Sequence, residues 1–503
     1  MQAKTLREQY DLIIVGAGTS GCIIAAHVAE RGVRARDGEP LRIALIEAGP
    51  HLEGSLNPGY GAVSRRAMFT NISNDESGRW VWPWPEAAKM VGGCSMHWGN
   101  NAYAPYDMDY THWMNETGVD WSKDKFKDAV EEITREYNIG EVPDETYSIG
   151  NRMFKQAVES MGHKTSYVPS GRKNCIFCGY CGDGNFCKYD SKANVLPYLE
   201  RALRKGVELF PDALVQRVTI EKRGERGIAQ GVVLTLKDGS TREVKADRVL
   251  VSCGTYGTPV LLARSGYGPR EQLGDKALVH NPNIGQNLEI QPGHDVWAYY
   301  DADVKTERGA GNNGHYFWPE TTADGYNVVT LRSTILSFPN YPQAAALRSF
   351  APRFGQAHKE FMRSAVRRVG GVRSSILTPL VKGSINVITG DTTYPYSDPR
   401  NVKRLHWAAE IMREIHKKMG AKKIEEQLPT SFRGGHPTGT CRAGADPKTS
   451  VVDPHFRSHD VENLLICDGS VIPRSCLGHK HIPVSVTAAF AARRIVADYF
   501  KRG

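Results

Sequence analysis

The stretch from residue 10 to residue 50 constrains the fold of this chain more than any other segment. Residues 11–15 form a short, β-branched apolar run that is typical of a buried parallel strand. Residues 16–21 are rich in glycine, and residues 22–30 have the apolar spacing of a helix. Residues 41–47 form a second apolar run that ends on an acid. The order predicts a strand, a tight turn, a helix and a second parallel strand.

The glycines and the acid of this stretch form a dinucleotide-binding pattern. Gly16 allows a tight turn, Gly18 lets the backbone approach a pyrophosphate, and Gly21 lets the helix pack closely on the strand. The helix N-terminus offers free N–H groups and a positive dipole end to phosphates. Glu47 is expected to accept a hydrogen bond from a ribose hydroxyl and to disfavour a 2′-phosphate. A simple glycine-rich turn is the competing interpretation, and the complete strand, helix and acid argue against it.

The length of the chain indicates how many domains it has, and its charge and apolar runs argue against nucleic-acid binding and membrane proteins. A chain of 503 residues is too long for one ordinary core, so two domains are expected. The net charge of +9 is modest, and the basic segment 348–373 is too short for a nucleic-acid or membrane-binding face. No apolar run approaches the ~20 residues that span a bilayer. No export signal is visible, so we expect a cytoplasmic protein, or a periplasmic one if a signal-bearing partner subunit carries it out.

The chain beyond the first pattern suggests a discontinuous α/β architecture. We predict a discontinuous Rossmann-like nucleotide-binding domain from residues 1–115, 195–290 and 431–503, interrupted by a helical and cysteine-rich insertion at 116–194. Residues 291–430 are assigned to an α+β substrate-binding domain with an antiparallel sheet.

Alternating apolar residues predict the strands that follow the insertion. Residues 207–221 and 231–244 are interpreted as one hairpin, and residues 248–252 as a further buried strand.

Four of the ten cysteines lie between residues 175 and 187. Cys175, Cys178, Cys181 and Cys187 have the spacing Cys-x-x-Cys-x-x-Cys-x5-Cys, which favours an iron–sulfur cluster of the 4Fe–4S or 3Fe–4S type. Four thiolates also suit zinc, and a disulfide-stapled loop or free thiols are further alternatives. The absence of an export signal favours a metal over disulfides.

Several segments together resemble the glucose–methanol–choline (GMC) oxidoreductases, which are flavoenzymes that act on alcohols and sugars. Tyr267 departs from the family pattern, where an aliphatic residue is usual. The middle of the predicted substrate domain matches nothing in the family. The matching segments are residues 16–21, 47–50, 91–97, 254–268, 284–288, 436–440 and 463–470.

The resemblance implies that the cofactor is FAD. It places Gly92 and Gly93 against the flavin, Val215 beside the adenine, and Asp468 with Gly469 at the ribityl and pyrophosphate part.

His97 lies in a segment that is similar to pyranose oxidases, in which this histidine is covalently bound to the flavin. A non-covalent packing role occurs in relatives as well, and both interpretations remain open.

The catalytic residues are also implied by the resemblance. Alcohol oxidation needs a base for the hydroxyl proton while a hydride passes to flavin N5, and a neutral imidazole suits the base. The family's first histidine corresponds to His436. The second corresponds to His481, with His479 as its rival, because the link at residues 473–483 is longer than usual.

These patterns predict an FAD-dependent dehydrogenase that oxidises a hydroxyl of a sugar, glycoside or related alcohol to a carbonyl. Electrons would leave the flavin through the iron–sulfur cluster to a small subunit or a cytochrome. One alternative is a pyranose oxidase-like enzyme that uses O2 and has a structural metal or thiol loop. Another is a flavoprotein that has lost catalysis and serves electron transfer or assembly, and the intact His436 argues against it.

Overall fold

The structure is a computed structural model, and its described part covers most of the chain. It comprises residues 5–34, 37–52, 68–69, 73–74, 80–81, 87–178, 187, 189–305, 314–317, 329–334, 350, 354–377, 379–425 and 433–501.

The helices of the described part are α1 Thr19–Arg31, α3 Asp107–Thr117, α4 Lys123–Glu136, α5 Ile149–Ser160, α6 Leu196–Arg204, α7 Gly254–Arg264, α8 Arg270–Leu273, α10 Gln356–Arg368, α11 Pro399–Lys418 and α12 His481–Tyr499. The longer strands are β1 Gln9–Val15, β2 Ile43–Ile46, β10 Glu208–Phe210, β11 Leu214–Arg223, β12 Arg226–Thr235, β13 Thr241–Val251, β16 Glu289–Tyr299, β17 His315–Phe317, β18 Val329–Thr334, β19 Val369–Ile376, β23 Arg433–Thr438 and β25 Leu464–Ile466. The two-residue strands are β3 Met68–Phe69, β4 Ser73–Asn74, β5 Trp80–Val81, β6 Ala87–Ala88, β7 Ile139–Gly140, β8 Ser166–Tyr167, β9 Ser170–Gly171, β14 Tyr267–Gly268, β15 Val279–His280, β20 Ser384–Ile385, β21 Thr392–Thr393, β22 Lys423–Ile424 and β24 Val461–Glu462.

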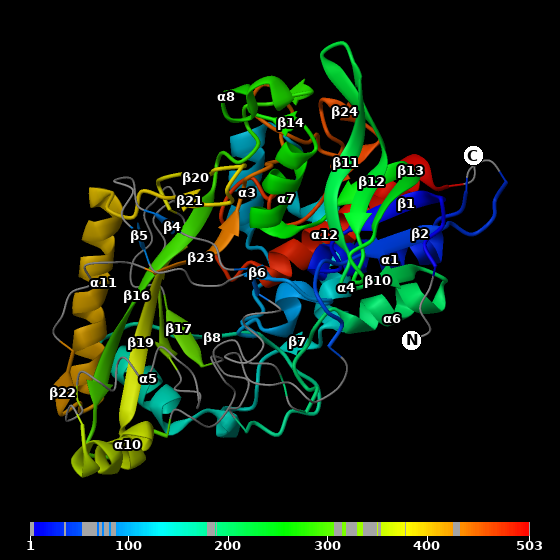
Figure 1. Cartoon of the computed structure of the whole chain (residues 1–503). Coiled ribbons are helices and arrows are strands. Elements are labelled where there is room, and N and C mark those ends of the chain that lie inside the picture. The colour runs from blue at the N-terminus through cyan, green and yellow to red at the C-terminus, as the bar shows by residue number, and fades with distance from the viewer. Residues whose placement is uncertain are drawn as a thin grey trace.

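The first sheet follows from the opening stretch of the sequence. Strand β1 is buried along almost its whole length, as its apolar run predicts, and it pairs in parallel with β2 and β13. The sheet has the order β10-β2-β1-β13-β12-β11, and β25 adds to it in parallel beside β13. Helices α1, α4, α6 and α12 pack together beside it (Figure 1). The predicted Rossmann-like domain is confirmed, and strands from distant parts of the chain complete it.

The predicted single hairpin is wrong in both strands, and residues 231–244 run from the second half of β12 through a turn into the start of β13. Within residues 207–221, β10 is a separate strand that pairs in parallel with β2, while β11, β12 and β13 form an antiparallel meander. Pro211 has no N–H to donate, and Asp212 has a positive φ of 52°, so the strand breaks between β10 and β11. The predicted buried strand at 248–252 is largely the end of β13.

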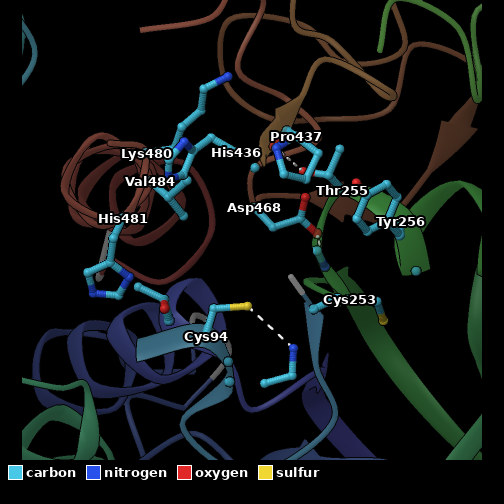
Figure 2. A pocket seen from close by; sticks show the side chains of 18 of the residues that line it. Cys94, Cys253, Thr255, Tyr256, His436, Pro437, Asp468, Lys480, His481 and Val484 are labelled. Carbon is cyan, nitrogen blue, oxygen red and sulfur yellow. Dashed lines mark hydrogen bonds between the residues drawn. The ribbon is translucent and has the colours of Figure 1, made fainter. Parts of the chain in front are cut away.

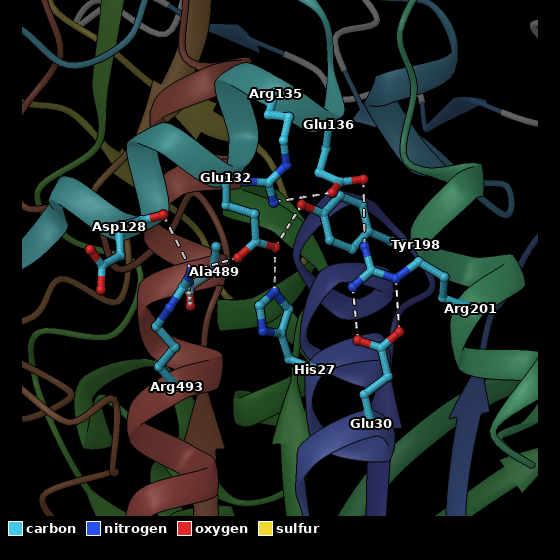
Figure 3. Close-up of polar contacts among 10 residues, drawn as sticks. All are labelled: His27, Glu30, Asp128, Glu132, Arg135, Glu136, Tyr198, Arg201, Ala489 and Arg493. Atoms are coloured by element: carbon cyan, nitrogen blue, oxygen red, sulfur yellow. Dashed lines mark hydrogen bonds and ion pairs between the residues drawn. The ribbon is translucent and has the colours of Figure 1, made fainter.

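A buried polar network joins four helices of the first domain (Figure 3). The carboxylate of Glu132 on α4 accepts hydrogen bonds from His27 Nε2 on α1 at 2.7 Å and from the Tyr198 hydroxyl on α6 at 2.9 Å. Its other oxygen is 2.5 Å from Arg493 Nη2 on α12. Burial alone would raise the pKa of Glu132, but the bond and charge of His27, with Arg493, lower it to about 2. Glu132 is therefore a charged residue at the junction of these helices.

The second sheet is antiparallel and is organised around β16. Its order is β22-β16-β19-β18-β17-β8, and β23 also pairs with β16. Helices α11 and α5 cover it with a second apolar core (Figure 1). The predicted antiparallel sheet is confirmed. The proposed division into residue ranges stays a prediction.

The unusual Tyr267 has its own polar partners in the first domain. It is fully buried, its hydroxyl donates to Asp460 Oδ2 at 2.9 Å, and it accepts from Ser458 Oγ at 3.0 Å. The burial of a tyrosine in place of an aliphatic residue is therefore compensated by hydrogen bonds.

Within the described residues, no helix combines the length and apolar character needed to cross a membrane.

Candidate active site

A cavity of about 640 Å³ lies where the first domain meets the second sheet. Its wall includes the turn after β1, the ends of β2 and β13, the start of α7, and parts of β16, β19 and β23. The carboxyl ends of parallel strands are the usual place for a ligand in an open α/β sheet. Figure 2 shows that residues from separate parts of the chain converge here, with Cys94, Cys253, His436, Asp468 and His481 around the space.

The glycines of the opening pattern shape one end of this cavity. Gly16 has a φ of 102°, and a Cβ there would lie 2.3 Å from Ser252 O. A Cβ on Gly21 would lie 2.0 Å from Gly16 O, so α1 approaches the strand closely only with glycine. Gly18 lines the cavity, and a Cβ on it would meet only Gly93 Cα, at 3.9 Å. A side chain at Gly18 would enter the space that a pyrophosphate needs.

The second glycine segment lies against the first. Gly92 N–H donates to Ala17 O at 2.8 Å, and a Cβ on Gly93 would lie 2.8 Å from Gly18 Cα. The two predicted cofactor-binding segments therefore meet, although they are separate in the sequence.

The two predicted cofactor-binding acids hold the surrounding main chain. Glu47 accepts hydrogen bonds from Ala17 N and Gly49 N, each at 2.9 Å. Asp468 accepts from Gly254 N at 2.9 Å, from Thr258 Oγ1 at 2.6 Å and from Ser470 N at 2.7 Å. Burial raises the pKa of both carboxyl groups. The acids thus keep the turn after β1 and the start of α7 in place at the cavity wall.

The remaining predicted cofactor residues also line the cavity. Val215 on β11 forms an apolar wall with its neighbours Ala213 and Leu214, and Gly469 follows Asp468. A cavity of this volume with a glycine cradle, an apolar wall and an acid at the end of β2 fits FAD.

His97 and His481 form a neutral pair of imidazoles at the wall. Burial lowers the pKa of His97 to about 4, and the charge of Lys192 adds to this. Burial likewise lowers the pKa of His481 to about 3, with further contributions from Lys192 and His97. The ring of His481 lies 4.1 Å from that of Trp98 and is stacked on Tyr137 at 5.7 Å. Both imidazoles are neutral at neutral pH, and the covalent link at His97 stays a prediction.

His436 is held in one tautomer by Gln291. Its Nδ1 lies 2.8 Å from Gln291 Oε1, and the Gln291 amide nitrogen lies 2.7 Å from Cys476 O and 3.3 Å from Gly478 O. Carbonyl oxygens only accept hydrogen bonds, so the amide nitrogen faces them and Oε1 faces the imidazole. His436 Nδ1–H therefore donates to Gln291, and His436 Nε2 carries the lone pair. Its φ of 61° is unusual for histidine and typical of a functional constraint.

His479 is the histidine that the structure brings next to His436. Their ring centres are 4.5 Å apart, with the rings nearly perpendicular at 78°. His479 Nε2 lies 3.2 Å from Asn101 Nδ2, a contact in which the amide donates. The predicted second catalytic histidine, His481, lines the same cavity but lies against Trp98 and Tyr137. The geometry therefore favours the rival, His479, as the partner of His436.

Sequence reasoning missed several polar residues of the wall, among them Asn101, Gln291, Asp295 and Arg373. Gln291, Asp295 and Arg373 belong to the predicted substrate-binding domain and lie outside the segments that match family motifs. The available signal was that alternate positions at the start of residues 291–299 carry Gln291, Gly293 and Asp295, which would give a strand one polar face.

The predicted cluster ligands are only partly described. Cys181 lies outside the described residues. Cys175 Sγ accepts from Phe177 N at 3.4 Å and lies 3.7 Å from Arg172 Nη1, and Cys187 Sγ accepts from Ser191 N at 3.2 Å. Among the described residues, no three histidine, cysteine or acidic side chains are grouped to hold a metal. The predicted metal site therefore has no support from the described geometry.

The cysteine segment is nevertheless connected to the cavity wall. Lys192 Nζ donates to Trp98 O at 2.9 Å, and Trp98 is the residue on which His481 packs.

Comparison with known proteins agrees with the geometry. The family described as GMC oxidoreductase matches residues 10–293 with its N-terminal part and residues 391–488 with its C-terminal part. An alcohol dehydrogenase [acceptor] of Pseudomonas putida is 23% identical and is covered over 96% of its length by 97% of this chain. A 6'''-hydroxyparomomycin C oxidase of Streptomyces lividus is 24% identical, with 94% of this chain covering 89% of it.

The fold is likewise similar to that of a solved oxidase. The crystal structure of a pyridoxine 4-oxidase from "Mesorbium loti" superposes with a TM-score of 0.72 at 19% identity, over 96% of this chain and 98% of that one.

Proposed function

The chain belongs to the GMC oxidoreductase family of FAD-dependent enzymes that act on alcohol CH–OH groups, and on this premise we propose that it oxidises a hydroxyl of a sugar, glycoside or related polyol to a carbonyl. The observation that carries the proposal is the pair of His436 and His479 at the cavity wall, with His436 held by Gln291. Bound FAD supplies the acceptor for the hydride.

His436 and His479 are the residues that act on the hydroxyl group of the substrate. His436 Nε2 takes the proton of the substrate hydroxyl, because Nδ1 already donates to Gln291. His479, 4.5 Å away, orients the same hydroxyl oxygen and is itself oriented by Asn101. A neutral imidazole suits this role because it exchanges protons near neutral pH.

The residues that would hold FAD are the loop glycines, the two acids and the apolar wall around Val215. Their placement supports the cofactor assignment because they leave open the cradle that a pyrophosphate needs.

The cysteine segment is proposed as the route by which electrons leave, through an iron–sulfur cluster to a small subunit or cytochrome. The proposal rests on the spacing of the four cysteines in the sequence. Cys175 Sγ and Cys187 Sγ each accept a hydrogen bond from a main-chain N–H, and Lys192, five residues after Cys187, donates to Trp98 O at the cavity. The alternative is a pyranose oxidase-like enzyme that passes its electrons to O2.

The first prediction is spectroscopic and tests the function directly. Purified protein should contain about one FAD per chain, and anaerobic addition of a substrate glycoside or polyol should bleach its flavin absorbance. Folded protein that binds NAD but no flavin would contradict the proposal.

The same preparation also tests the route by which electrons leave and the covalent link between His97 and FAD. Iron measured in anaerobically purified protein tests the electron route, and zinc without iron would favour the oxidase alternative. Flavin that remains with acid-precipitated protein would indicate the covalent link at His97.

The second prediction concerns Gln291 as the residue that orients His436. Gln291→Leu should lower the rate of flavin reduction by about 10–100-fold with FAD retained, as for other residues that orient a reactive group. Gln291→Glu restores an acceptor for Nδ1–H but adds a negative charge that stabilises imidazolium. The base must be neutral, so the acid limb of kcat/KM should move to higher pH in this variant. An unchanged pH profile in Gln291→Glu would remove the orienting role.

A further inference from the structure

One face of strand β16 leads away from the catalytic histidines. Side chains alternate along a strand, so Gln291, Gly293 and Asp295 share this face. In the antiparallel register, Ser375 of β19 lies opposite Gly293, and Arg373 lies opposite Asp295. All five residues line the cavity, so the face is a wall of the same space that holds His436.

An ion pair stands at the far end of this face. Arg373 Nε is 2.8 Å from Asp295 Oδ1, and Arg373 Nη2 is 3.2 Å from Asp295 Oδ2. The two side chains are only 14% and 5% exposed, so the pair is largely desolvated yet borders the cavity. An alkyl chain placed against it would remove its remaining water and offer nothing in return, which is unfavourable. A hydroxyl can donate to the carboxylate and accept from the guanidinium.

The space between the two ends is shaped by small residues. A Cβ on Gly293 would lie 2.5 Å from Ser374 O, so the packing of β16 on β19 keeps this position without a side chain. Ser375 opposite it is also small. The rise of a strand places Asp295 about 13 Å from Gln291 along β16. That span is longer than one pyranose ring.

We propose that Asp295 and Arg373 form a distal recognition site for the hydroxyls of a second sugar ring. The preferred substrate class is then a neutral glycoside of at least two rings, which lies over Gly293 and is oxidised at the end next to His436. The inference rests on the proposed oxidation of alcohols and adds the size and polarity of the substrate.

The test compares substrates on the FAD-loaded enzyme by anaerobic flavin reduction. The panel contains two-ring glycosides (maltose, cellobiose and sucrose), their one-ring counterparts (glucose and a methyl glucoside) and 1-butanol. The parent enzyme should show its highest kcat/KM with a two-ring glycoside. A one-ring sugar or 1-butanol that equals or exceeds every two-ring member would overturn the inference.

The variant is the double substitution Asp295→Leu with Arg373→Met. Replacement of a buried ion pair by apolar residues of similar volume usually preserves stability, whereas a single substitution leaves a buried charge. We expect kcat/KM for the two-ring glycosides to fall about 10–100-fold, as for the loss of hydrogen bonds to charged groups, with the one-ring and 1-butanol values unchanged.

The matched control is Asp303→Asn, which removes an ion pair with Arg367 at 2.6 Å in the same domain but outside the cavity wall. It should alter none of the values. An equal fall for all substrates in the double variant would indicate a structural role and overturn the inference, as would no change at all. Flavin that no member of the panel reduces would instead contradict the proposed oxidation itself, and the inference with it.

Discussion

His436→Ala is expected to reduce its flavin about two to four orders of magnitude more slowly than the parent enzyme while it keeps its FAD and its fold. The substitution removes the nitrogen that accepts the substrate proton. Glu47 and Asp468, which hold the loops at the cavity wall, do so through hydrogen bonds to Ala17, Gly49, Gly254, Thr258 and Ser470, which the substitution leaves in place. The measurement is the rate of anaerobic flavin reduction at saturating substrate, with FAD content determined in the same sample.

A second substitution separates chemistry from backbone strain at this position. His436 has a φ of 61°, which asparagine adopts more readily than alanine. His436→Asn should therefore be as slow as His436→Ala although its backbone is less strained. Parental turnover in either variant would show that His436 is not the base.

Alanine variants of the other two histidines complete the comparison. The contact between His436 and His479 predicts a large fall for His479→Ala and a smaller one for His481→Ala. The reverse order would restore His481 as the second catalytic residue.

Glu132→Gln is expected to lower the free energy of unfolding by about 3 kcal/mol at pH 7, the range observed when one member of a buried ion pair is removed. The charge of Glu132 is shared by His27, Tyr198 and Arg493, which come from three other helices (Figure 3). Its loss leaves the Arg493 guanidinium without its counter-ion. Urea denaturation followed by far-UV circular dichroism measures the difference.

The pH dependence of this loss has a defined sign. The pKa of Glu132 is lowered to about 2 in the folded protein, below the ordinary value of about 4.3 for an unfolded chain. The stabilisation is therefore complete above the unfolded pKa and is lost as pH falls toward 2. The gap between parent and Glu132→Gln should narrow once the pH is below about 5.

Its neighbour Glu131 is exposed on the same helix, so Glu131→Gln is the matched control and should differ little from the parent. A Glu132→Gln protein as stable as this control would show that the network adds no net stability.

The parts of the fold that sequence predicted well are local. The turn at Gly16, the helix after it and the strand ending at Glu47 depend on residues within one short segment, and the structure has them as expected. The predicted hairpin was wrong because β10 pairs in parallel with the distant strand β2. Nothing in residues 207–221 indicates with which strand they pair.

The arrangement of the site depends on contacts that are distant in the chain. Gln291 and His436 are 145 positions apart, and Asn101 and His479 are 378 apart. A single sequence carries no signal that pairs such residues, so motif spacing pointed to His481, whereas the geometry places His479 beside His436. The ion pair of Asp295 and Arg373 was missed for the same reason, since only the register of β16 and β19 brings these residues together.

Strand β25, which pairs with β13 in the first sheet, is synthesised long after the strands beside which it lies. The glycine turn is translated early, but β25, Asp468 and the α12 helix that packs on α1 are translated near the end of the described chain. At ribosomal rates of ~5–20 residues per second, α1 waits for roughly 20–90 s before these elements exist. During that interval Ile23, Ile24 and Val28, which are fully buried in the finished protein, lack the partner helix that covers them. The cavity wall that includes Asp468 is therefore complete only after these last elements have been synthesised.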